Sequence, residues 1–268
     1  MAEFQYILGI IGAGNMSGAI TDGILRVGKL DPKRIIVGDI DAEKLDRLKK
    51  SGFAVTSDNK FLAENSQNVL FAVKPQVFES AANEIKSGIK AEAVLSVMAG
   101  VGTAKLAAFF ANPIKICRVM PNTPCMIGKG ICALTFAGYS DGEKKFVFDI
   151  FDALGETVEL SEEKFDAVTA VSGSGPAYVY SFIDAVIKGG VEKGLTFGEA
   201  KKLTVSVFKG AAELAERSEK SLDELIKNVA SKGGTTEAAL KIFAERGVAD
   251  GIREGVFAAA ERSKELGK

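Results

Sequence analysis

Gly12-Ala-Gly-Asn-Met-Ser-Gly18 is the stretch that decides the fold, because it joins a short apolar run, 6–11, to an amphipathic stretch, 15–27. In a dinucleotide-binding βαβ unit the first glycine permits a tight turn, and the second lets the backbone approach a pyrophosphate. The small residues Ser17 and Gly18 would let the helix pack closely on the strand. The N–H groups at the helix start form an anion site. The sequence therefore predicts a dinucleotide-binding turn, with an ordinary glycine turn as the alternative.

Further apolar runs follow this unit and alternate with amphipathic stretches. Together with 6–11 they predict strands at 34–39, 68–73, 93–97 and 114–119. Such alternation is typical of βαβ units with a parallel sheet covered by helices on both faces. After about residue 160 the strand pattern stops, and the rest reads as helices joined by short glycine-bearing turns. We therefore expect an α/β chain, with a doubly wound parallel sheet in residues 1–160 and an all-helical domain in 161–268.

Asp39 ends the second expected strand, about 20 residues after the glycine turn, where dinucleotide-binding folds place an acidic residue. A carboxylate there can accept hydrogen bonds from the adenosine ribose hydroxyls of NAD. It would repel the 2′-phosphate of NADP by about 1 kcal/mol at 4 Å in water, or about 4 kcal/mol at a dielectric constant of 20. NADH use is therefore plausible, although a solvated strand-end acid is the alternative. Four basic residues are near enough to offset the repulsion: Lys33, Arg34, Lys44 and Arg47.

Three further loops follow expected strands, on the edge where open α/β sheets bind ligands. Two are Ala72-Val-Lys-Pro-Gln76 and Met98-Ala-Gly100. Lys74 in the first could contact a phosphate or substrate, or could simply be solvated. In the third, Met120-Pro-Asn-Thr-Pro124, two prolines fix a rigid loop around Asn122. Either this loop orients the nicotinamide or it is a structural turn.

Composition excludes several classes of function. The 268 residues carry 34 Lys and Arg against 35 Asp and Glu, so the footprint of a non-specific nucleic-acid binder is absent. The sequence contains no apolar stretch of about 18 residues without charged or helix-breaking residues, so a membrane span is not expected. The start, Met1-Ala-Glu-Phe4, lacks the basic region of a signal peptide, so none is expected. Three cysteines without a CxxC pair fit a reduced, cytoplasmic chain. With no histidine, imidazole catalysis and His-ligated zinc are excluded, and we predict no metal site.

The helical half has two hydroxyl-rich turns, Ala170-Val-Ser-Gly-Ser-Gly-Pro176 and Val229-Ala-Ser-Lys-Gly-Gly-Thr-Thr-Glu237. Free N–H groups and hydroxyls at a helix start suit a small carboxylate, and plain N-capping is the alternative. Capping boxes are expected at Thr196 and Ser221. After Thr196, apolar residues at helical spacing predict a core stripe or a subunit interface: Ala200, Leu203, Val207, Ala211 and Leu214.

Five motifs, in order along essentially the whole chain, resemble those of pyrroline-5-carboxylate reductase. They are Gly9-Ile-Ile-Gly-Ala-Gly-Asn-Met16, Ala72-Val-Lys-Pro75, Pro121-Asn-Thr-Pro124, Ser172-Gly-Ser-Gly-Pro-Ala-Tyr178 and Ser231-Lys-Gly-Gly-Thr-Thr236. The resemblance implies a Rossmann domain followed by a helical domain that forms a homodimer by interleaving, with further assembly into a ring of dimers. It also implies the last step of proline synthesis, in which NAD(P)H reduces the cyclic imine 1-pyrroline-5-carboxylate to L-proline.

The same resemblance implies residue roles. Thr236 would lie beside the substrate ring nitrogen, and the substrate would also meet Ser174, Ser231, Gly233, Gly234 and Thr235. Besides Asp39, the cofactor would meet Gly12, Gly14, Asn15, Met16, Asn59, Ala72, Lys74, Ala99 and Asn122. The sequence departs from the family twice. Lys232 stands where proline is usual, so this turn is expected to be less rigid, and Asp39 stands where NADPH-preferring members often have small or basic residues.

Three rival interpretations are distinct enough to test. A β-hydroxyacid dehydrogenase joins the same two kinds of domain but needs an acid-base lysine, for which Lys188 and Lys193 are the nearest candidates. An imine reductase of different substrate range would share the chemistry. A non-catalytic NAD(H)-sensing module would keep the glycine turn and have no need of the hydroxyls at 231–236.

Overall fold

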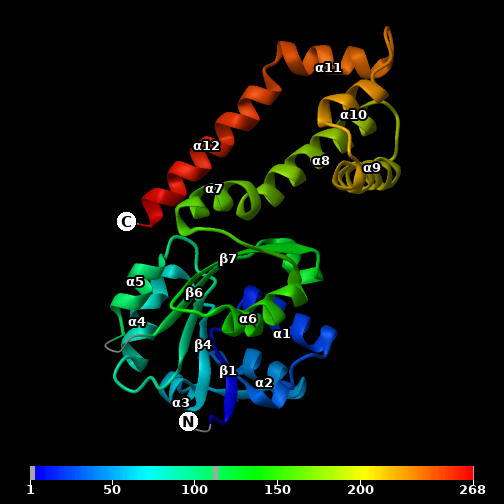
Figure 1. Ribbon diagram of the computed structural model, residues 1–268. Helices are drawn as coiled ribbons and strands as arrows, with labels where there is room; N and C mark the ends of the chain where they lie inside the picture. The colour runs from blue at the N-terminus through cyan, green and yellow to red at the C-terminus, as the bar shows by residue number, and fades with distance from the viewer. Residues whose placement is uncertain (1–3, 111–113, 268) are drawn as a thin grey trace. The chain divides into compact units, whose positions relative to one another are not determined.

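The structure is a computed structural model that describes residues 4–110 and 114–267 (Figure 1). Met1–Glu3, where we expect no signal peptide, lie outside the described residues. The chain forms two compact units, one of Met1–Ser174 together with Ala259–Lys268, the other of Gly175–Ala258. Among the described residues, none of the helices has both the length and the apolar character that crossing a membrane requires.

The first unit is built on one eight-stranded sheet in the order β3-β2-β1-β4-β5-β6-β7-β8. All neighbouring strands are parallel except β6 and β7. Since β1 pairs with β2 on one side and with β4 on the other, the winding reverses between β1 and β4, which is where such sheets bind ligands. The strands are β1 (Tyr6–Ile11), β2 (Ile35–Gly38), β3 (Ala54–Thr56), β4 (Ser66–Phe71), β5 (Ala93–Ser96), β6 (Lys115–Met120), β7 (Gly130–Ala137) and β8 (Gly155–Glu159).

The expected fold class is confirmed, with additions that the sequence pattern did not reveal. All five expected strands are present within two residues of the predicted bounds, whereas β3, β7 and β8 were not predicted. The connection from β6 to β7 contains only the 3₁₀ helix η2 (Thr123–Ile127). A parallel crossover needs a dozen or more residues, so this short connection makes β7 antiparallel to β6.

Helices cover both faces of the sheet, and each face has its own hydrophobic core (Figure 1). On one face Ile20, Leu48 and Phe151 come from α1 (Asn15–Val27), α2 (Ala42–Lys50) and α6 (Asp141–Phe151). On the other face the helices are α3 (Asn59–Asn65), α4 (Pro75–Ile85) and α5 (Thr103–Ala108). With both faces covered, the central strands are uniformly apolar. Short 3₁₀ helices complete the unit: η1 (Pro32–Arg34), η3 (Asp152–Leu154) and η4 (Glu162–Lys164).

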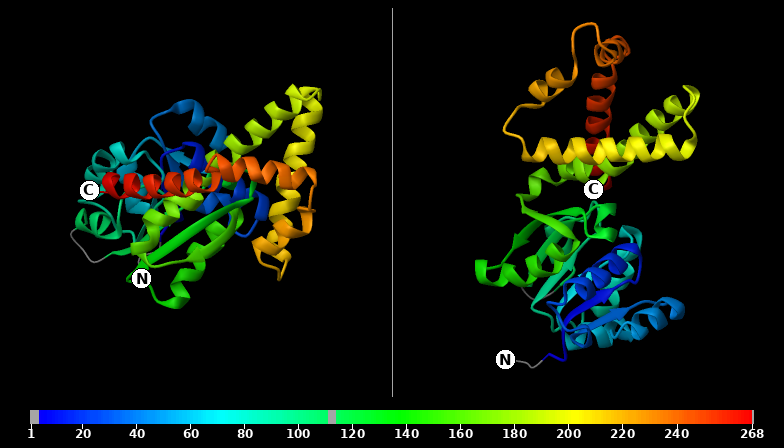
Figure 2. Two further views of the ribbon diagram at one scale, coloured as in Figure 1. Left: turned by 90° about the horizontal axis from the view of Figure 1, so that it is seen from above. Right: turned by 90° about the vertical axis from the view of Figure 1, so that its right-hand side faces the viewer.

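The chain leaves the sheet through α7 (Phe165–Val168) and a π-helical turn, Thr169–Gly173. The second unit consists of helices, and α8 packs against α9, which follows it in the chain (Figure 2). Both expected capping boxes, at Thr196 and Ser221, are present. The helices are α8 (Gly175–Glu192), α9 (Phe197–Arg217), α10 (Leu222–Val229), α11 (Thr235–Glu245) and α12 (Val248–Leu266), whose last turns belong to the first unit.

The apolar stripe of α9 is not a core of this chain. Ala200 is buried, but Leu203, Val207 and Leu214 are 56%, 66% and 59% exposed. That exposure does not fit the core interpretation of the stripe and is compatible with the subunit-interface interpretation.

Candidate active site

The glycine turn lies at the carboxyl end of β1, at the point where the strand order reverses. Gly12 has φ +103°, which favours glycine, and a Cβ there would lie 2.9 Å from the carbonyl oxygen of Ala72. A Cβ at Gly14 would meet nothing within 4 Å, and the side chains that the structure describes do not cap α1 there. The start of α1 is thus left without a side-chain cap and with space beside Gly14, which fits a dinucleotide pyrophosphate.

The helix that follows packs on the sheet through Ser17 rather than Gly18. Ser17 is fully buried, whereas a Cβ on Gly18 would meet only the Arg47 side chain at 3.9 Å, so the expected close approach at Gly18 is wrong. Asn15, the first residue of α1, is exposed, and Met16 packs partly against the hydrophobic core.

Asp39 holds the glycine turn in place. Its Oδ2 accepts a hydrogen bond from the Ala13 N–H at 2.6 Å, and its Oδ1 accepts one from the Asp41 N–H at 2.9 Å. The side chain is half-buried and both of its oxygens are hydrogen-bonded, so Asp39 is more than a solvated acid at a strand end. Each carboxylate oxygen can accept a second hydrogen bond, which leaves room for ribose hydroxyls.

Asn59 lies beside the same strand end. Its Oδ1 is 3.1 Å from the position that a Cβ on Gly38 would take, and its Nδ2 donates to Glu84 Oε2 at 2.7 Å. Gly38 is the last residue of β2 and directly precedes Asp39, so Asn59, from α3, lies at the same strand end.

The loops after β4 and β5 reach the same edge of the sheet. Ala72 donates its N–H to the Ile11 carbonyl at 2.9 Å, directly before the glycine turn. Lys74 is exposed and precedes α4, and Ala99 is exposed after β5. The neighbouring Gly100 is buried with φ +75°, and a Cβ there would lie 3.1 Å from the Leu266 carbonyl oxygen near the end of α12. The last turn of α12 thus packs against the loop that carries Ala99.

The loop after β6 turns the Asn122 side chain inward. Its Oδ1 accepts from the Ile131 N–H at 3.1 Å and lies 3.6 Å from Cys125 Sγ. Cys125 Sγ in turn lies 3.7 Å from Cys132 Sγ, and both thiols are buried. The contact with Cys125 and burial both raise the pKa of Cys132, so that group stays a thiol. The side-chain oxygen of Asn122 therefore has a structural role, and of the side-chain amide only the NH₂ group remains for a ligand.

The segment with Ser172 and Ser174 is not a turn between two helices, as the glycines suggested. Thr169–Gly173 is π-helical and leads directly into α8. The Ser172 hydroxyl donates back to the Val168 carbonyl at 3.0 Å, and the Ser174 N–H donates to the Thr169 carbonyl at 2.8 Å. π-Helical turns occur often at functional sites. Ser174 is the last residue of its stretch of the first unit.

The hydroxyl-rich turn of the second unit precedes α11. Gly233 has φ +73°, and a Cβ on Gly234 would lie 2.5 Å from Ser231 Oγ. The turn itself thus requires both glycines, so they are not by themselves a sign of a ligand. Gly234 is the N-cap residue of α11, and none of the described side chains caps the helix there. The turn borders a groove of about 580 Å³ that also includes Glu237 and Lys241. Ser231 and Thr235 are exposed and Thr236 is half-buried.

An ion pair between buried Arg118 and half-buried Glu162 was missed by the sequence interpretation. Arg118, in the middle of β6 and only 7% exposed, donates to Glu162 Oε1 at 3.1 Å and stacks on the Phe165 ring at 4.7 Å. Glu162 also accepts bonds from the N–H and hydroxyl of Thr103, at the start of α5. Burial raises the pKa of Glu162, but the bonds from Thr103 and Arg118 outweigh it and leave that pKa below its usual value. The pair ties the sheet to the segment leading into the helices.

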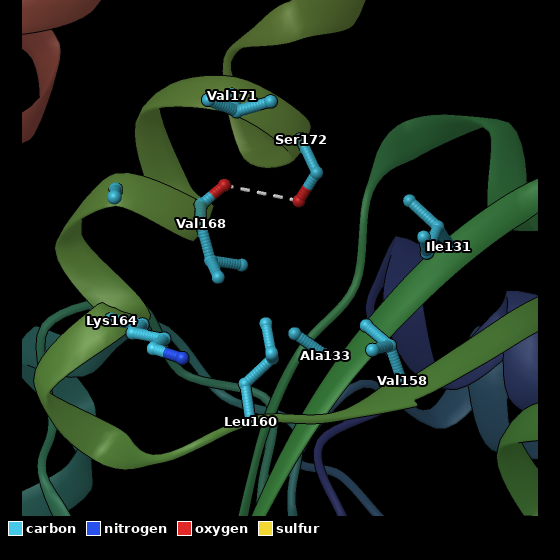
Figure 3. Close-up of a pocket in the computed structure, with 9 residues that line it drawn as sticks. Ile131, Ala133, Val158, Leu160, Lys164, Val168, Val171 and Ser172 are labelled. Atoms are coloured by element: carbon cyan, nitrogen blue, oxygen red, sulfur yellow. Dashed lines mark hydrogen bonds between the residues drawn. The ribbon is translucent and has the colours of Figure 1, made fainter.

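An apolar cavity of about 360 Å³ lies above β7 and β8. Figure 3 shows Val168 of α7 facing Leu160, while the Ser172 hydroxyl turns back to the Val168 carbonyl. The lining includes Lys164 and Ser172 as its polar residues, so the cavity offers little for polar recognition. It was not predicted, because its walls come from strands that the sequence pattern did not reveal.

Lys188, one of the two candidates for the acid-base lysine of a β-hydroxyacid dehydrogenase, does not suit that role. Lys188 is exposed and pairs with Asp184 Oδ2 at 2.6 Å. The hydrogen bond and the charge of Asp184 raise the pKa of Lys188, which makes it a poor proton donor near neutral pH.

Two family models match the chain. One, described as pyrroline-5-carboxylate reductase dimerisation, covers residues 162–266. The other, described as NADP oxidoreductase coenzyme F420-dependent, covers residues 7–100.

Full-length relatives also match. Pyrroline-5-carboxylate reductase of Aquifex aeolicus is 37% identical, over 97% of each chain, and that of Synechocystis is 38% identical, over 97% of this chain and 98% of the relative. Among solved structures, Plasmodium falciparum pyrroline carboxylate reductase with NADP bound superposes with a TM-score of 0.90 at 31% identity. That match covers 99% of this chain and 100% of the other.

Proposed function

The chain belongs to the pyrroline-5-carboxylate reductase family, and from that membership we infer its reaction, the NAD(P)H-dependent reduction of 1-pyrroline-5-carboxylate to L-proline. This is the last step of proline biosynthesis, and the chain is an oxidoreductase that associates with itself. The observation that carries the assignment is the combination within one chain of an open glycine turn at the sheet's switch point and a hydroxyl-rich turn before α11.

Cofactor binding is assigned to residues 1–160. The open N-terminus of α1 would hold the pyrophosphate, and Asp39 with Asn59 would meet the adenosine ribose. When bound, the reduced nicotinamide supplies a hydride to the imine carbon. The further cofactor contacts proposed are Gly12, Gly14, Asn15, Met16, Ala72, Lys74, Ala99 and Asn122.

Substrate binding is assigned to residues 161–268. The backbone N–H groups and hydroxyls of Ser231–Thr236 would hold the substrate carboxylate, with Ser174 as a further contact. Thr236 would face the ring nitrogen. A protonated imine brings its own proton and is already a strong electrophile, so the chain needs no strong general acid. As that nitrogen loses its positive charge, the Thr236 hydroxyl can keep a hydrogen bond to it, and positioning can supply several kcal/mol.

We further propose that the self-associated form is a homodimer that assembles into a ring of dimers. Light scattering coupled to gel filtration would measure the number of copies directly. The three cysteines are free and buried, which supports a cytoplasmic location.

One assay tests the reaction. Purified protein is mixed with NADH or NADPH and pyrroline-5-carboxylate, and loss of reduced cofactor is followed together with formation of L-proline. Parallel reactions contain no substrate, or a β-hydroxyacid with the oxidised cofactor. Proline formation only with pyrroline-5-carboxylate supports the proposal. Turnover of the hydroxyacid instead, or cofactor binding without turnover, would contradict it.

A further inference from the structure

Glu237 reaches back from the first turn of α11 onto the turn that precedes it. Its Oε2 accepts a hydrogen bond from the Gly233 N–H at 2.6 Å. From this contact we propose that Glu237 is a positioning residue that fixes the substrate-binding turn in its open-amide form. The inference rests on the proposed function, because it takes Ser231–Thr236 as the place where the substrate carboxylate binds.

The turn needs such a restraint because its own backbone is permissive. Gly233 holds a left-handed conformation, φ +73°, that glycine leaves as readily as it enters. Position 232 is a lysine, which leaves its own φ free, unlike proline. The Gly234 N–H is already bonded to the Ser231 carbonyl at 2.9 Å. The Glu237 bond to Gly233 is a second bond across the turn, and it opposes rotation of the Gly233 peptide.

The hydrogen bond to Glu237 uses the Gly233 N–H for the structure of the turn and leaves other backbone N–H groups available to a ligand. The first backbone hydrogen bond of α11 runs from the Ala238 N–H to the Gly234 carbonyl. The N–H groups of Thr235 and Thr236 therefore have no backbone partner within the helix. In the described chain, Gly234 has no side-chain cap. With Gly233 held by Glu237, these two amides remain free to meet a carboxylate, next to the helix dipole.

An opposite role for Glu237 is chemically possible and has the opposite consequence. A carboxylate on this turn could simply occupy the place of the substrate carboxylate and repel it. Removing the negative charge would then strengthen substrate binding, whereas removing a positioning bond weakens it. The bond to Gly233 favours positioning, because it engages the amide that lies outside the helix start rather than those of Thr235 and Thr236.

Substitution of Glu237 separates these roles. Glu237→Ala and Glu237→Leu both remove the acceptor, and Glu237→Gln keeps an acceptor oxygen without the charge. At saturating cofactor we expect both acceptor-free variants to raise KM for pyrroline-5-carboxylate about tenfold with kcat changed less than about threefold. Glu237→Gln should stay within about twofold of wild type. Binding of L-proline, measured by calorimetry, should weaken in parallel with the change in KM.

Two further variants serve as controls. Glu245→Ala removes another exposed carboxylate of α11, one that pairs only loosely with Lys241 at 4.0 Å, and should leave KM unchanged. Lys232→Pro combined with Glu237→Ala should restore most of the lost affinity, since the ring fixes the neighbouring backbone by other means. A purely structural role would lower the melting temperature without this division between KM and kcat.

An unchanged or lower KM in the acceptor-free variants would overturn the inference, as would a Glu237→Gln variant as impaired as Glu237→Ala. These outcomes are distinct from failure of the proposed function, in which wild-type protein itself would form no proline from pyrroline-5-carboxylate.

Discussion

Asp39→Asn should separate two effects of one carboxylate on cofactor binding. In the structure Asp39 accepts hydrogen bonds from the N–H groups of both Ala13 and Asp41, at 2.6 and 2.9 Å. It thereby supports the turn that would hold the pyrophosphate, and it places a negative charge where a 2′-phosphate would approach. Support for the turn matters equally for NADH and NADPH, whereas the charge acts against NADPH alone.

The two effects have different sizes and different signatures. Asparagine has one acceptor oxygen, so it loses one of the two bonds, which costs up to about 1.5–3 kcal/mol for a charged acceptor. Half-exposure of Asp39 reduces this to about 1 kcal/mol, or about a fivefold loss of kcat/KM with either cofactor. Removal of the charge relieves a repulsion of about 1–4 kcal/mol, nearer the lower limit at this half-exposed position. We therefore expect the NADPH to NADH ratio of kcat/KM to rise about tenfold.

The assay is kcat/KM for each cofactor at saturating pyrroline-5-carboxylate, in wild type and variant, at two salt concentrations. The shift in the ratio should shrink at high salt, because screening weakens the repulsion. Asp31→Asn is the matched control, since Asp31 is an exposed carboxylate that caps η1 through the Lys33 N–H. A ratio that does not move would refute the placement of Asp39 at the cofactor's ribose. A rise in NADH efficiency would refute its role in supporting the turn.

Three further experiments test the site and the fold. Thr236→Ala should lower kcat/KM ten- to a hundredfold, about 1.4–2.7 kcal/mol, and wild-type kinetics would remove Thr236 from the active site. The pKa of Glu162 is lowered in the folded protein, so its pairing with Arg118 stabilises the fold above the unfolded pKa and that contribution is lost as pH falls through the folded value. Glu162→Gln should thus lose about 1 kcal/mol at neutral pH, with a smaller difference from wild type in acid, in urea unfolding across pH. Gly155→Ala should lower the free energy of unfolding by more than about 2 kcal/mol, because φ is +140° and a Cβ would overlap the neighbouring strand. Gly142→Ala is the control: a Cβ there meets open space, so the change should stay within about 0.5 kcal/mol. Melting temperatures of the two variants would check both values.

Local patterns in the sequence predicted the first half of the fold well. Apolar runs set the bounds of β1, and Gly28, left-handed at the end of α1, marks where that helix stops. β8 was missed because its five residues, Gly155–Glu159, are only partly buried and carry two glutamates. The antiparallel direction of β7 follows from the length of its connection, which the apolar pattern does not encode.

The candidate site divides in the same way. The residue types in the glycine turn and before α11 could be interpreted from the sequence, because backbone conformation and chemistry there are local. The contacts that hold them could not, since Asp39 meets Ala13 from 26 residues away and Arg118 meets Glu162 from 44 residues away. The bond from Gly233 to Glu237 spans only four residues, and an acidic residue in the first turn of a helix was a signal that could have revealed it.

The exposed apolar side chains of the second unit connect fold stability to assembly. Leu203, Val207 and Leu214 of α9 and Phe257 of α12 are each more than half exposed, and the family model that matches residues 162–266 is a dimerisation model. Burying apolar surface stabilises by about 25 cal/mol per Å², so helices that leave such residues uncovered contribute little stability on their own. Self-association through this segment would cover them, and the folded population would then depend on protein concentration. We therefore expect the order of the proposed substrate-binding turn to depend on self-association, because α11, which follows the turn, also leaves Ile242 and Phe243 more than half exposed.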